Sequence, residues 1–224
     1  KKLNIIVIAT GGKLIKYAQK YELPYIQMPN FGIQPRSALG FNCRAILRAM
    51  GQVKLYKETS LLTTTLKGEN YEARGKKLAK ALKNKIPIIY SSTNNVSIAY
   101  NWKIKFNETG KMPAFYNVLP ELNHNEMTGF DVQPSSKKLS DKFFFIFIRD
   151  DKDHKKIQRR MDVVARLYKK RKLPVVNLKL SGKNKWQQIF SSLLIADWAA
   201  YYTAMSYKLE PEEVPMVEEF KKMI

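Results

Sequence analysis

The stretch from Ile86 to Phe130 constrains the fold more than any other part of the chain. The run Ile86–Tyr90 is apolar without alternation and is followed by the turn cluster Ser91–Asn95. This pattern is typical of a buried strand in a parallel sheet. Apolar residues then recur at helical spacing until Gly110, and the short apolar segment Phe115–Leu119 comes next. The stretch therefore predicts a strand, a helix and a second, parallel strand.

The rest of the chain repeats this alternation. Periodicity predicts further strands at 3–9, 25–28, 142–148 and 175–180, and helices at 36–50, 71–82, 153–170 and 185–205. Residues 51–70 are polar, rich in Thr and poorly periodic, which indicates a linker or crossing connection. The alternation predicts an α/β fold whose parallel sheet is covered on both faces and joined by right-handed crossovers. We expect two parts, residues 1–70 and residues 71–224.

The turn cluster after the first buried strand is the expected ligand site. In open α/β sheets, ligands bind beyond the carboxyl ends of the strands, and helix-start amides favour anions. The candidate substrate-binding residues, with hydroxyl and amide side chains, are Ser91, Ser92, Thr93, Asn94 and Asn95. They suit a sugar or an anionic group.

Three ionisable residues are candidates for catalysis. Glu108 lies on the last turn of a predicted helix, at the negative end of its dipole, although Lys105 and Lys111 could simply balance a solvated carboxylate. His124, one of two histidines, lies in a polar cluster, either as a surface residue or as a catalytic one. Arg36 lies at a helix start, where a cation is unhelpful unless it meets an anion.

Composition excludes several classes of protein. Hydrophobic residues make up 45% of the 224 residues, and no apolar run is long enough to span a membrane. With no secretory leader pattern, we expect a cytoplasmic protein. The net charge of +21 is spread over every predicted helix, and its densest basic blocks lack interleaved aromatic residues, which argues against a dedicated nucleic-acid surface. No metal or cofactor motif is present, and the single cysteine, Cys43, is expected to be a small core residue.

Several segments together resemble one family. Phe106–Lys111 (FNETGK) and Pro120–Phe130 (PELNHNEMTGF) look like the bifunctional phosphoglucose/phosphomannose isomerases, which are built from two sugar isomerase (SIS) domains. Ala9–Leu14, Pro35–Leu39 and Leu209–Lys222 agree with the same family in order and spacing. The resemblance implies a three-layer α/β/α SIS domain at 71–224, preceded by the remainder of a first SIS domain at 1–70.

The resemblance also implies an activity and a site. A member would interconvert glucose 6-phosphate and fructose 6-phosphate through an enediol(ate), without a cofactor. By this likeness Glu108 would carry the proton between C1 and C2, and His124 would promote ring opening. Arg36 would stabilise the enediolate, and Lys221 would assist ring opening or hold the substrate. Family members are dimers in which the histidine comes from the second chain, so we expect a homodimer.

Two departures from the family leave alternatives open. Val214 stands before Pro215 where the family usually has a threonine, so the likeness predicts phosphomannose activity less strongly than phosphoglucose activity. The family's N-terminal phosphate loop has no counterpart, so we expect a fragment, or a missing N-terminal half supplied by a second polypeptide. A non-catalytic SIS module that binds sugar phosphates is one alternative. A basic nucleic-acid-binding domain is another, resting on charge alone. The aromatic helix 185–205 could be core or an oligomer face, and the likeness favours the latter.

Overall fold

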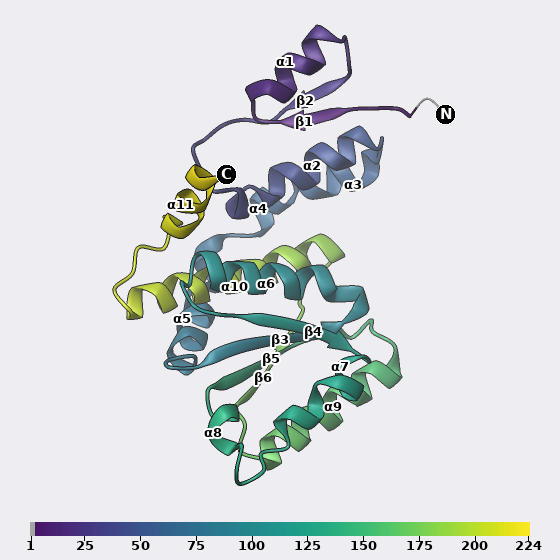
Figure 1. Cartoon of the computed structure of the whole chain (residues 1–224). Coiled ribbons are helices and arrows are strands. Elements are labelled where there is room, and N and C mark those ends of the chain that lie inside the picture. The colour runs from purple at the N-terminus through teal and green to yellow at the C-terminus, as the bar shows by residue number, and fades with distance from the viewer. Residues whose placement is uncertain (1–2) are drawn as a thin grey trace. The chain divides into compact units, whose positions relative to one another are not determined.

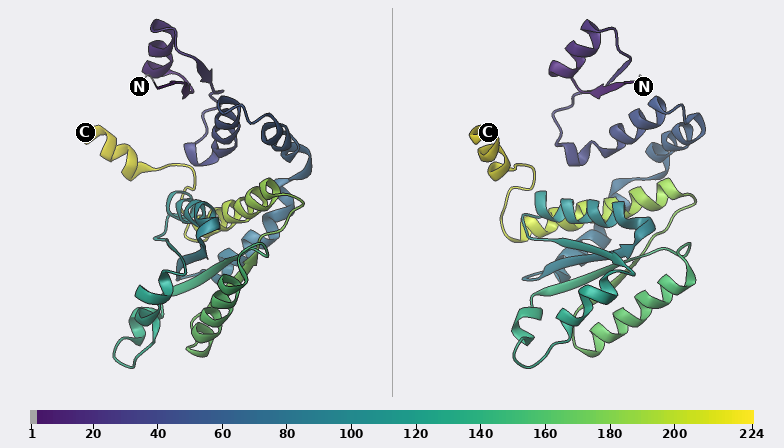
Figure 2. Two further views of the ribbon diagram at one scale, coloured as in Figure 1. Left: turned by 90° about the vertical axis from the view of Figure 1, so that its right-hand side faces the viewer. Right: turned by 45° about the vertical axis from the view of Figure 1, so that its right-hand side comes forward.

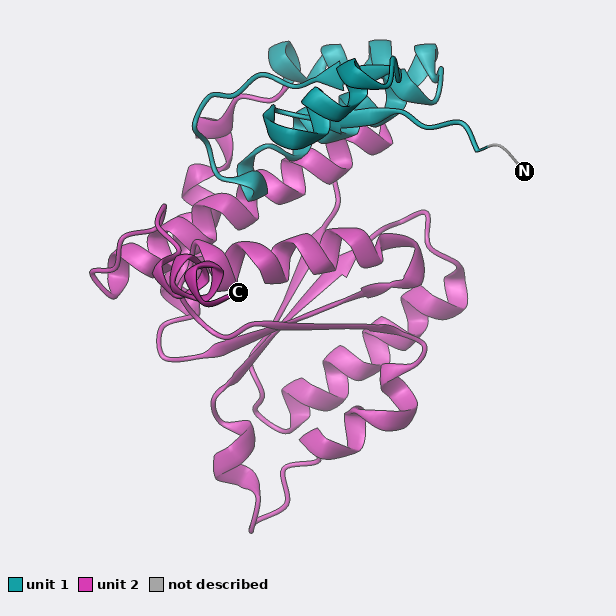
Figure 3. Ribbon diagram, turned by 45° about the horizontal axis from the view of Figure 1, so that its top comes forward, with its two compact units in different colours: residues 1–65 teal, residues 66–224 magenta. Residues whose placement is uncertain are grey.

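The computed structural model describes residues 3–224 and divides the chain into two compact units. Unit 1 comprises Lys1–Thr65 and unit 2 comprises Leu66–Ile224, coloured separately in Figure 3. Within residues 3–224, no helix has both the length and the apolar character needed to cross a bilayer.

Unit 1 contains a small parallel sheet followed by short helices. Strands β1 (Val7–Ala9) and β2 (Tyr25–Gln27) pair in parallel, with α1 (Gly12–Lys20) as their crossover. The elements that follow are η1 (Pro35–Ser37), α2 (Leu39–Ala49), α3 (Val53–Ser60) and α4 (Leu62–Thr65). The helix predicted at 36–50 is therefore split, and Arg36 lies in the short η1 turn.

Residues 51–70, predicted as a linker or crossing connection, are more helical than their weak periodicity indicated. Helices α3 and α4 occupy most of this segment. The Arg44 guanidinium on α2 donates to Thr59 Oγ1 at 2.9 Å and to Ser60 Oγ at 2.8 Å, and it lies over the Tyr56 ring at 4.2 Å. These contacts stabilise a helix pair that lacks a strong apolar stripe, because cation–π and hydrogen-bond contacts replace part of the apolar packing.

The buried side of α2 differs in part from its apolar periodicity. We expected Leu39, Cys43, Ile46 and Leu47 to share the buried face; Leu47 is buried, together with Ala45. Ile46 is 49% exposed and Cys43 is half-buried. Periodicity therefore placed Leu47 correctly and Ile46 incorrectly.

Unit 2 is a three-layer α/β/α structure around a four-stranded parallel sheet (Figure 1). The strand order is β4-β3-β5-β6, and the strands are β3 (Ile86–Ser92), β4 (Phe115–Leu119), β5 (Phe143–Arg149) and β6 (Val175–Lys179). The α-helices are α5 (Glu72–Ala81), α6 (Val96–Glu108), α7 (Leu122–Asn125), α8 (Lys137–Ser140), α9 (Lys155–Lys170), α10 (Lys185–Ser206) and α11 (Pro215–Met223). Three short turns, η2 (Gly68–Tyr71), η3 (Thr93–Asn95) and η4 (Met127–Phe130), complete the unit. The predicted parallel α/β fold is confirmed.

The two faces of the sheet are covered by different helices (Figures 1 and 2). Helices α7, α8 and α9 lie on one side, where one core cluster contains Tyr90, Phe145, Phe147 and Tyr168. Helices α6, α10 and α5 cover the other side, where Trp102 is fully buried and donates from Nε1 to Ser192 Oγ at 2.9 Å. Because successive strand side chains point to opposite faces, the sheet has two apolar sides, which explains its unalternated strands.

Candidate active site

The strand order creates a switch point between β3 and β5. After β3 the chain moves outward to β4, then crosses back to β5 on the other side of β3. Helices α6 and α9, which follow β3 and β5, therefore leave toward opposite faces (Figure 2). In open α/β sheets this divergence at the carboxyl edge is where ligands bind. The Ser91–Asn95 segment lies at this edge, as the sequence predicted.

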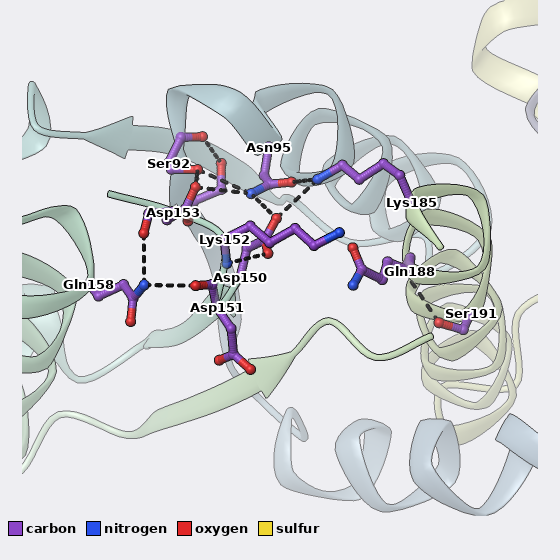
Figure 4. Close-up of polar contacts among 11 residues, drawn as sticks. Ser92, Asn95, Asp150, Asp151, Lys152, Asp153, Gln158, Lys185, Gln188 and Ser191 are labelled. Atoms are coloured by element: carbon purple, nitrogen blue, oxygen red, sulfur yellow. Dashed lines mark hydrogen bonds and ion pairs between the residues drawn. The ribbon is translucent and has the colours of Figure 1, made fainter. Parts of the chain in front are cut away.

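A polar network occupies the switch point (Figure 4), and its members other than Lys185 are buried. Ser92 Oγ donates to Asp153 Oδ1 at 2.6 Å, and Asn95 Nδ2 donates to Asp150 Oδ2 at 3.1 Å. Lys185 Nζ, from the first turn of α10, reaches Asn95 Oδ1 at 2.7 Å and Asp150 Oδ2 at 3.0 Å. The network joins the end of β3, the η3 turn, the loop after β5 and the start of α10, which meet at the same edge of the sheet.

Hydrogen bonds and a neighbouring ammonium group keep the Asp150 carboxylate ionised. Burial opposes this, but the Lys152 amide, the Lys185 ammonium and the Asn95 side chain outweigh it and lower the pKa of Asp150. Asp153 is 5% exposed, and its Oδ2 has no hydrogen-bond partner among the described residues. Asp150, Asp153 and Lys185 were not predicted as site residues from the sequence. The available signal was the acidic run directly after the apolar strand β5.

The network decides which residues of the Ser91–Asn95 segment can meet a ligand. Ser91, Ser92 and Asn95 are buried, and the last two are engaged with Asp150 and Asp153. Thr93 and Asn94 are exposed at the start of α6. A ligand at this edge would therefore meet the latter two side chains and the amides beside them.

His124 lies at the same edge, and its polar cluster forms the short helix α7. The imidazole is exposed, but Glu126, two residues later, ties the segment to the sheet. The Glu126 carboxylate accepts hydrogen bonds from Tyr90 on β3 and from Asn117 on β4. Burial, with the nearby Tyr168 and Glu126, raises the pKa of Tyr90 well above its ordinary value. Glu126 thus fixes α7, and with it the backbone of His124.

Glu108 lies at the opposite edge of the sheet, at the end of α6. Of the two lysines expected to balance it, Lys105 is buried and its ammonium pairs with Asp197 of α10. Lys111 Nζ donates to the Glu108 carbonyl at 2.5 Å and also to the carbonyls of Pro211, at 3.2 Å, and Glu213. The end of α6 is thereby joined to the segment that leads into α11.

The candidate residues fall into separate places. Helix α6 runs back along the sheet from the end of β3, and its 13 residues span about 20 Å. Glu108 and His124 of one chain therefore lie at opposite edges. Lys221 is exposed on α11, and its ammonium pairs with the Glu218 carboxylate at 2.7 Å. This helix follows the segment that Lys111 contacts. Arg36 belongs to unit 1. Within residues 3–224, no group of three or more His, Cys, Asp and Glu side chains could hold a metal ion.

Comparison with known proteins places this geometry in a family. Residues 71–224 match the model described as the bacterial phospho-glucose isomerase C-terminal SIS domain. A bifunctional phosphoglucose/phosphomannose isomerase of Aquifex aeolicus is 29% identical over 97% of the chain and 66% of its own length. The protein of the same name from Caldicellulosiruptor bescii is 33% identical over 100% of the chain and 69% of its own length. The chain thus spans about two thirds of these relatives.

Solved structures agree on the fold. A glucose-6-phosphate isomerase like protein from Thermus thermophilus aligns with a TM-score of 0.63 at 14% identity, over 98% of the chain and 78% of that protein. At such low identity the likeness concerns the fold alone. The sequence match over residues 71–224 shows the family as well as the fold, because it covers more than half of the chain, including Glu108, His124 and Lys221. The chain belongs to the bacterial phosphoglucose isomerase family, and its residues 71–224 are the C-terminal SIS domain of that family.

Proposed function

We propose that the chain acts in the aldose–ketose isomerisation of a sugar phosphate, interconverting glucose 6-phosphate and fructose 6-phosphate. The observation that carries the proposal is the family match over residues 71–224, which includes three of the four candidate catalytic residues. The relatives named bifunctional phosphoglucose/phosphomannose isomerase support the same reaction class.

The reaction needs few protein groups. A base takes the proton from C2 of the open-chain aldose and returns a proton to C1, while O1 gains and O2 loses a proton as the double bond moves through the enediol(ate). Glu108 is the proposed base, and His124 the group that opens the sugar ring. Lys221 assists ring opening or holds the substrate. Arg36 stabilises the negative charge of the enediolate. None of these steps needs a metal or an organic cofactor.

We further propose that one site draws on two chains. Glu108 and the α11 helix that carries Lys221 lie toward one edge of the sheet, and His124 lies at the other. About 20 Å separates the two ends of α6, too far for both groups to act on one sugar. In a homodimer, His124 of a second copy would face Glu108. Thr93 and Asn94, at the His124 edge, would contact the sugar from the same side.

The test is the rate of glucose 6-phosphate formation from fructose 6-phosphate by the purified protein. Glu108→Gln should lower kcat by about a thousandfold or more while leaving the fold intact, because it removes the proton carrier. Glu69→Gln, at an exposed carboxylate of η2, is the matched control and should keep full activity. Full activity in Glu108→Gln would refute the assignment.

The dimeric site has its own test. A mixture of Glu108→Gln chains with His124→Ala chains should regain activity, because each mixed dimer holds one site with both groups intact. Failure of two inactive variants to complement each other would contradict the shared site. Repeating the assay with mannose 6-phosphate tests whether Val214 narrows the range of substrates.

The alternative is a SIS module that binds sugar phosphates without catalysis. It predicts saturable binding of fructose 6-phosphate together with no exchange of the C2 or C1 hydrogen with solvent. Exchange that depends on Glu108 would exclude this reading.

A further inference from the structure

Lys111 makes an unusual set of contacts at the end of α6. Its ammonium group donates to three main-chain carbonyls: Glu108 at 2.5 Å, Pro211 at 3.2 Å, and Glu213. A protonated lysine has three N–H donors and can therefore serve three carbonyls at once. Two of the acceptors lie about a hundred residues further along the chain, which no helical pattern could indicate.

The local backbone explains why the side chain turns back toward the helix. Gly110 follows so closely on α6 that a Cβ there would lie 2.7 Å from the Phe106 carbonyl oxygen, so the tight turn needs glycine. Lys111 then adopts a left-handed conformation, with φ of +55°. The turn leaves the ammonium at the C-terminal end of α6, where unpaired carbonyls and the helix dipole favour a cation.

The far side of this contact is the segment that leads into α11. None of the residues in α11 is buried, and Leu209, before the segment, is 43% exposed. Apolar packing within the described chain therefore does little to place α11. The Lys111 contacts tie Glu213 to the end of α6, two residues before α11 begins at Pro215.

We propose that Lys111 is a positioning residue that sets the helix carrying Lys221 relative to Glu108. Lys221 lies six residues beyond Pro215, about 9 Å along the helix axis. Because one ammonium binds both the Glu108 carbonyl and the segment before α11, we expect Glu108 and α11 to keep a fixed relative position. We call this set of contacts the Lys111 clamp. The structural half of this inference stands on the contacts alone, and the catalytic half rests on the proposed function.

The structural half is tested by amide hydrogen exchange over residues 209–224. Lys111→Met removes all three hydrogen bonds, so exchange there should become about tenfold faster or more, since each bond involves a charged donor. Lys111→Arg keeps a cation and should show a smaller increase. Lys83→Met, which removes an exposed charge elsewhere in unit 2, is the matched control and should change nothing. Unchanged exchange in Lys111→Met would overturn the clamp and leave Lys111 as a helix cap only.

The catalytic half is tested by a double-mutant cycle on isomerase activity. If Lys111 acts through Lys221, Lys111→Met should lower kcat/KM by about tenfold or more in the parent but less than about twofold when Lys221→Met is already present. Fully additive losses would overturn the positioning role. Circular dichroism of each variant checks that the fold is retained, and partial activity in Lys111→Arg would mark the charge as the active feature.

The two proposals fail in different ways. If the unaltered protein turned over no sugar phosphate, the proposed function and the catalytic half would both fall, and the exchange experiment would still decide the clamp. If activity were present but exchange and the cycle showed no dependence on Lys111, the function would stand and the clamp would not.

Discussion

The substitution Gly75→Ala should destabilise unit 2 although alanine is the better helix former. Gly75 lies on α5 where this helix meets α10. A Cβ atom there would lie 2.3 Å from Trp198 Cβ and 2.8 Å from the Ala199 amide nitrogen. Favourable contacts between carbon atoms need about 3.5 to 4 Å, so the gap is more than an ångström too small.

The neighbours cannot yield by rotating a side chain, because they are main-chain and Cβ atoms. The helices must move apart, and such overpacking costs about 1 to 3 kcal/mol or more, against a gain of about 1 kcal/mol in helix propensity. Because the contact involves main-chain atoms, we take the upper end and expect a net loss of about 2 kcal/mol. This corresponds to a fall in Tm of roughly 4 to 8 °C for a unit of this size.

Tryptophan fluorescence during urea unfolding measures the effect on unit 2 alone, because all three tryptophans, Trp102, Trp186 and Trp198, lie in that unit. Gly129→Ala is the matched control, since nothing lies within 4 Å of a Cβ added at Gly129. If Gly75→Ala were as stable as the parent, close contact between α5 and α10 would be refuted as the reason for glycine.

Three further outcomes are expected. Asp150→Asn should reduce the free energy of unfolding at pH 7. Because folding lowers the pKa of Asp150, the extra stability of the parent should be complete above the unfolded pKa of 3.8 and should shrink as pH falls through the folded pKa. A constant difference between the two proteins in urea titrations from pH 2 to 7 would contradict this. Trp102→Phe should cost about 2 to 4 kcal/mol, measured by circular dichroism in urea, because it leaves a cavity and strands the buried Ser192 hydroxyl; a loss below about 1 kcal/mol would count against that hydrogen bond. Glu126→Gln should lower the free energy of unfolding by about 1 to 3 kcal/mol in the same assay, because it removes a charged acceptor from Tyr90. Tyr90→Phe made in the Glu126→Gln background should then lower the stability little further, and additive losses would mean that the pair does not interact.

Local pattern was sufficient for the strands and most of the helices in unit 2. The apolar run Ile86–Tyr90 predicted β3. The spacing of Val96, Ala99, Trp102 and Phe106 predicted the buried face of α6, where the last three are fully buried and Val96 is half-buried. These features can be predicted locally, because the pattern of apolar residues along a strand or helix indicates which of its faces are buried. The same approach failed at residues 51–70, where α3 is stabilised by the Arg44 contacts rather than by an apolar stripe.

Functional groups could be named from the sequence but not placed in space. Glu108, His124 and Lys221 were candidates because of residue type, position and family likeness. Only the tertiary structure separates Glu108 from His124 by the length of α6 and joins Glu108 to the segment before α11 through Lys111. Likewise, the sequence predicted Ser92 and Asn95 as ligand-binding residues, whereas in the structure they bind Asp153, after β5, and Lys185, on α10. The physical reason is the same in each case: periodicity reports the environment of one element, whereas a hydrogen bond between residues sixty to a hundred positions apart exists only once the sheet has brought their elements together.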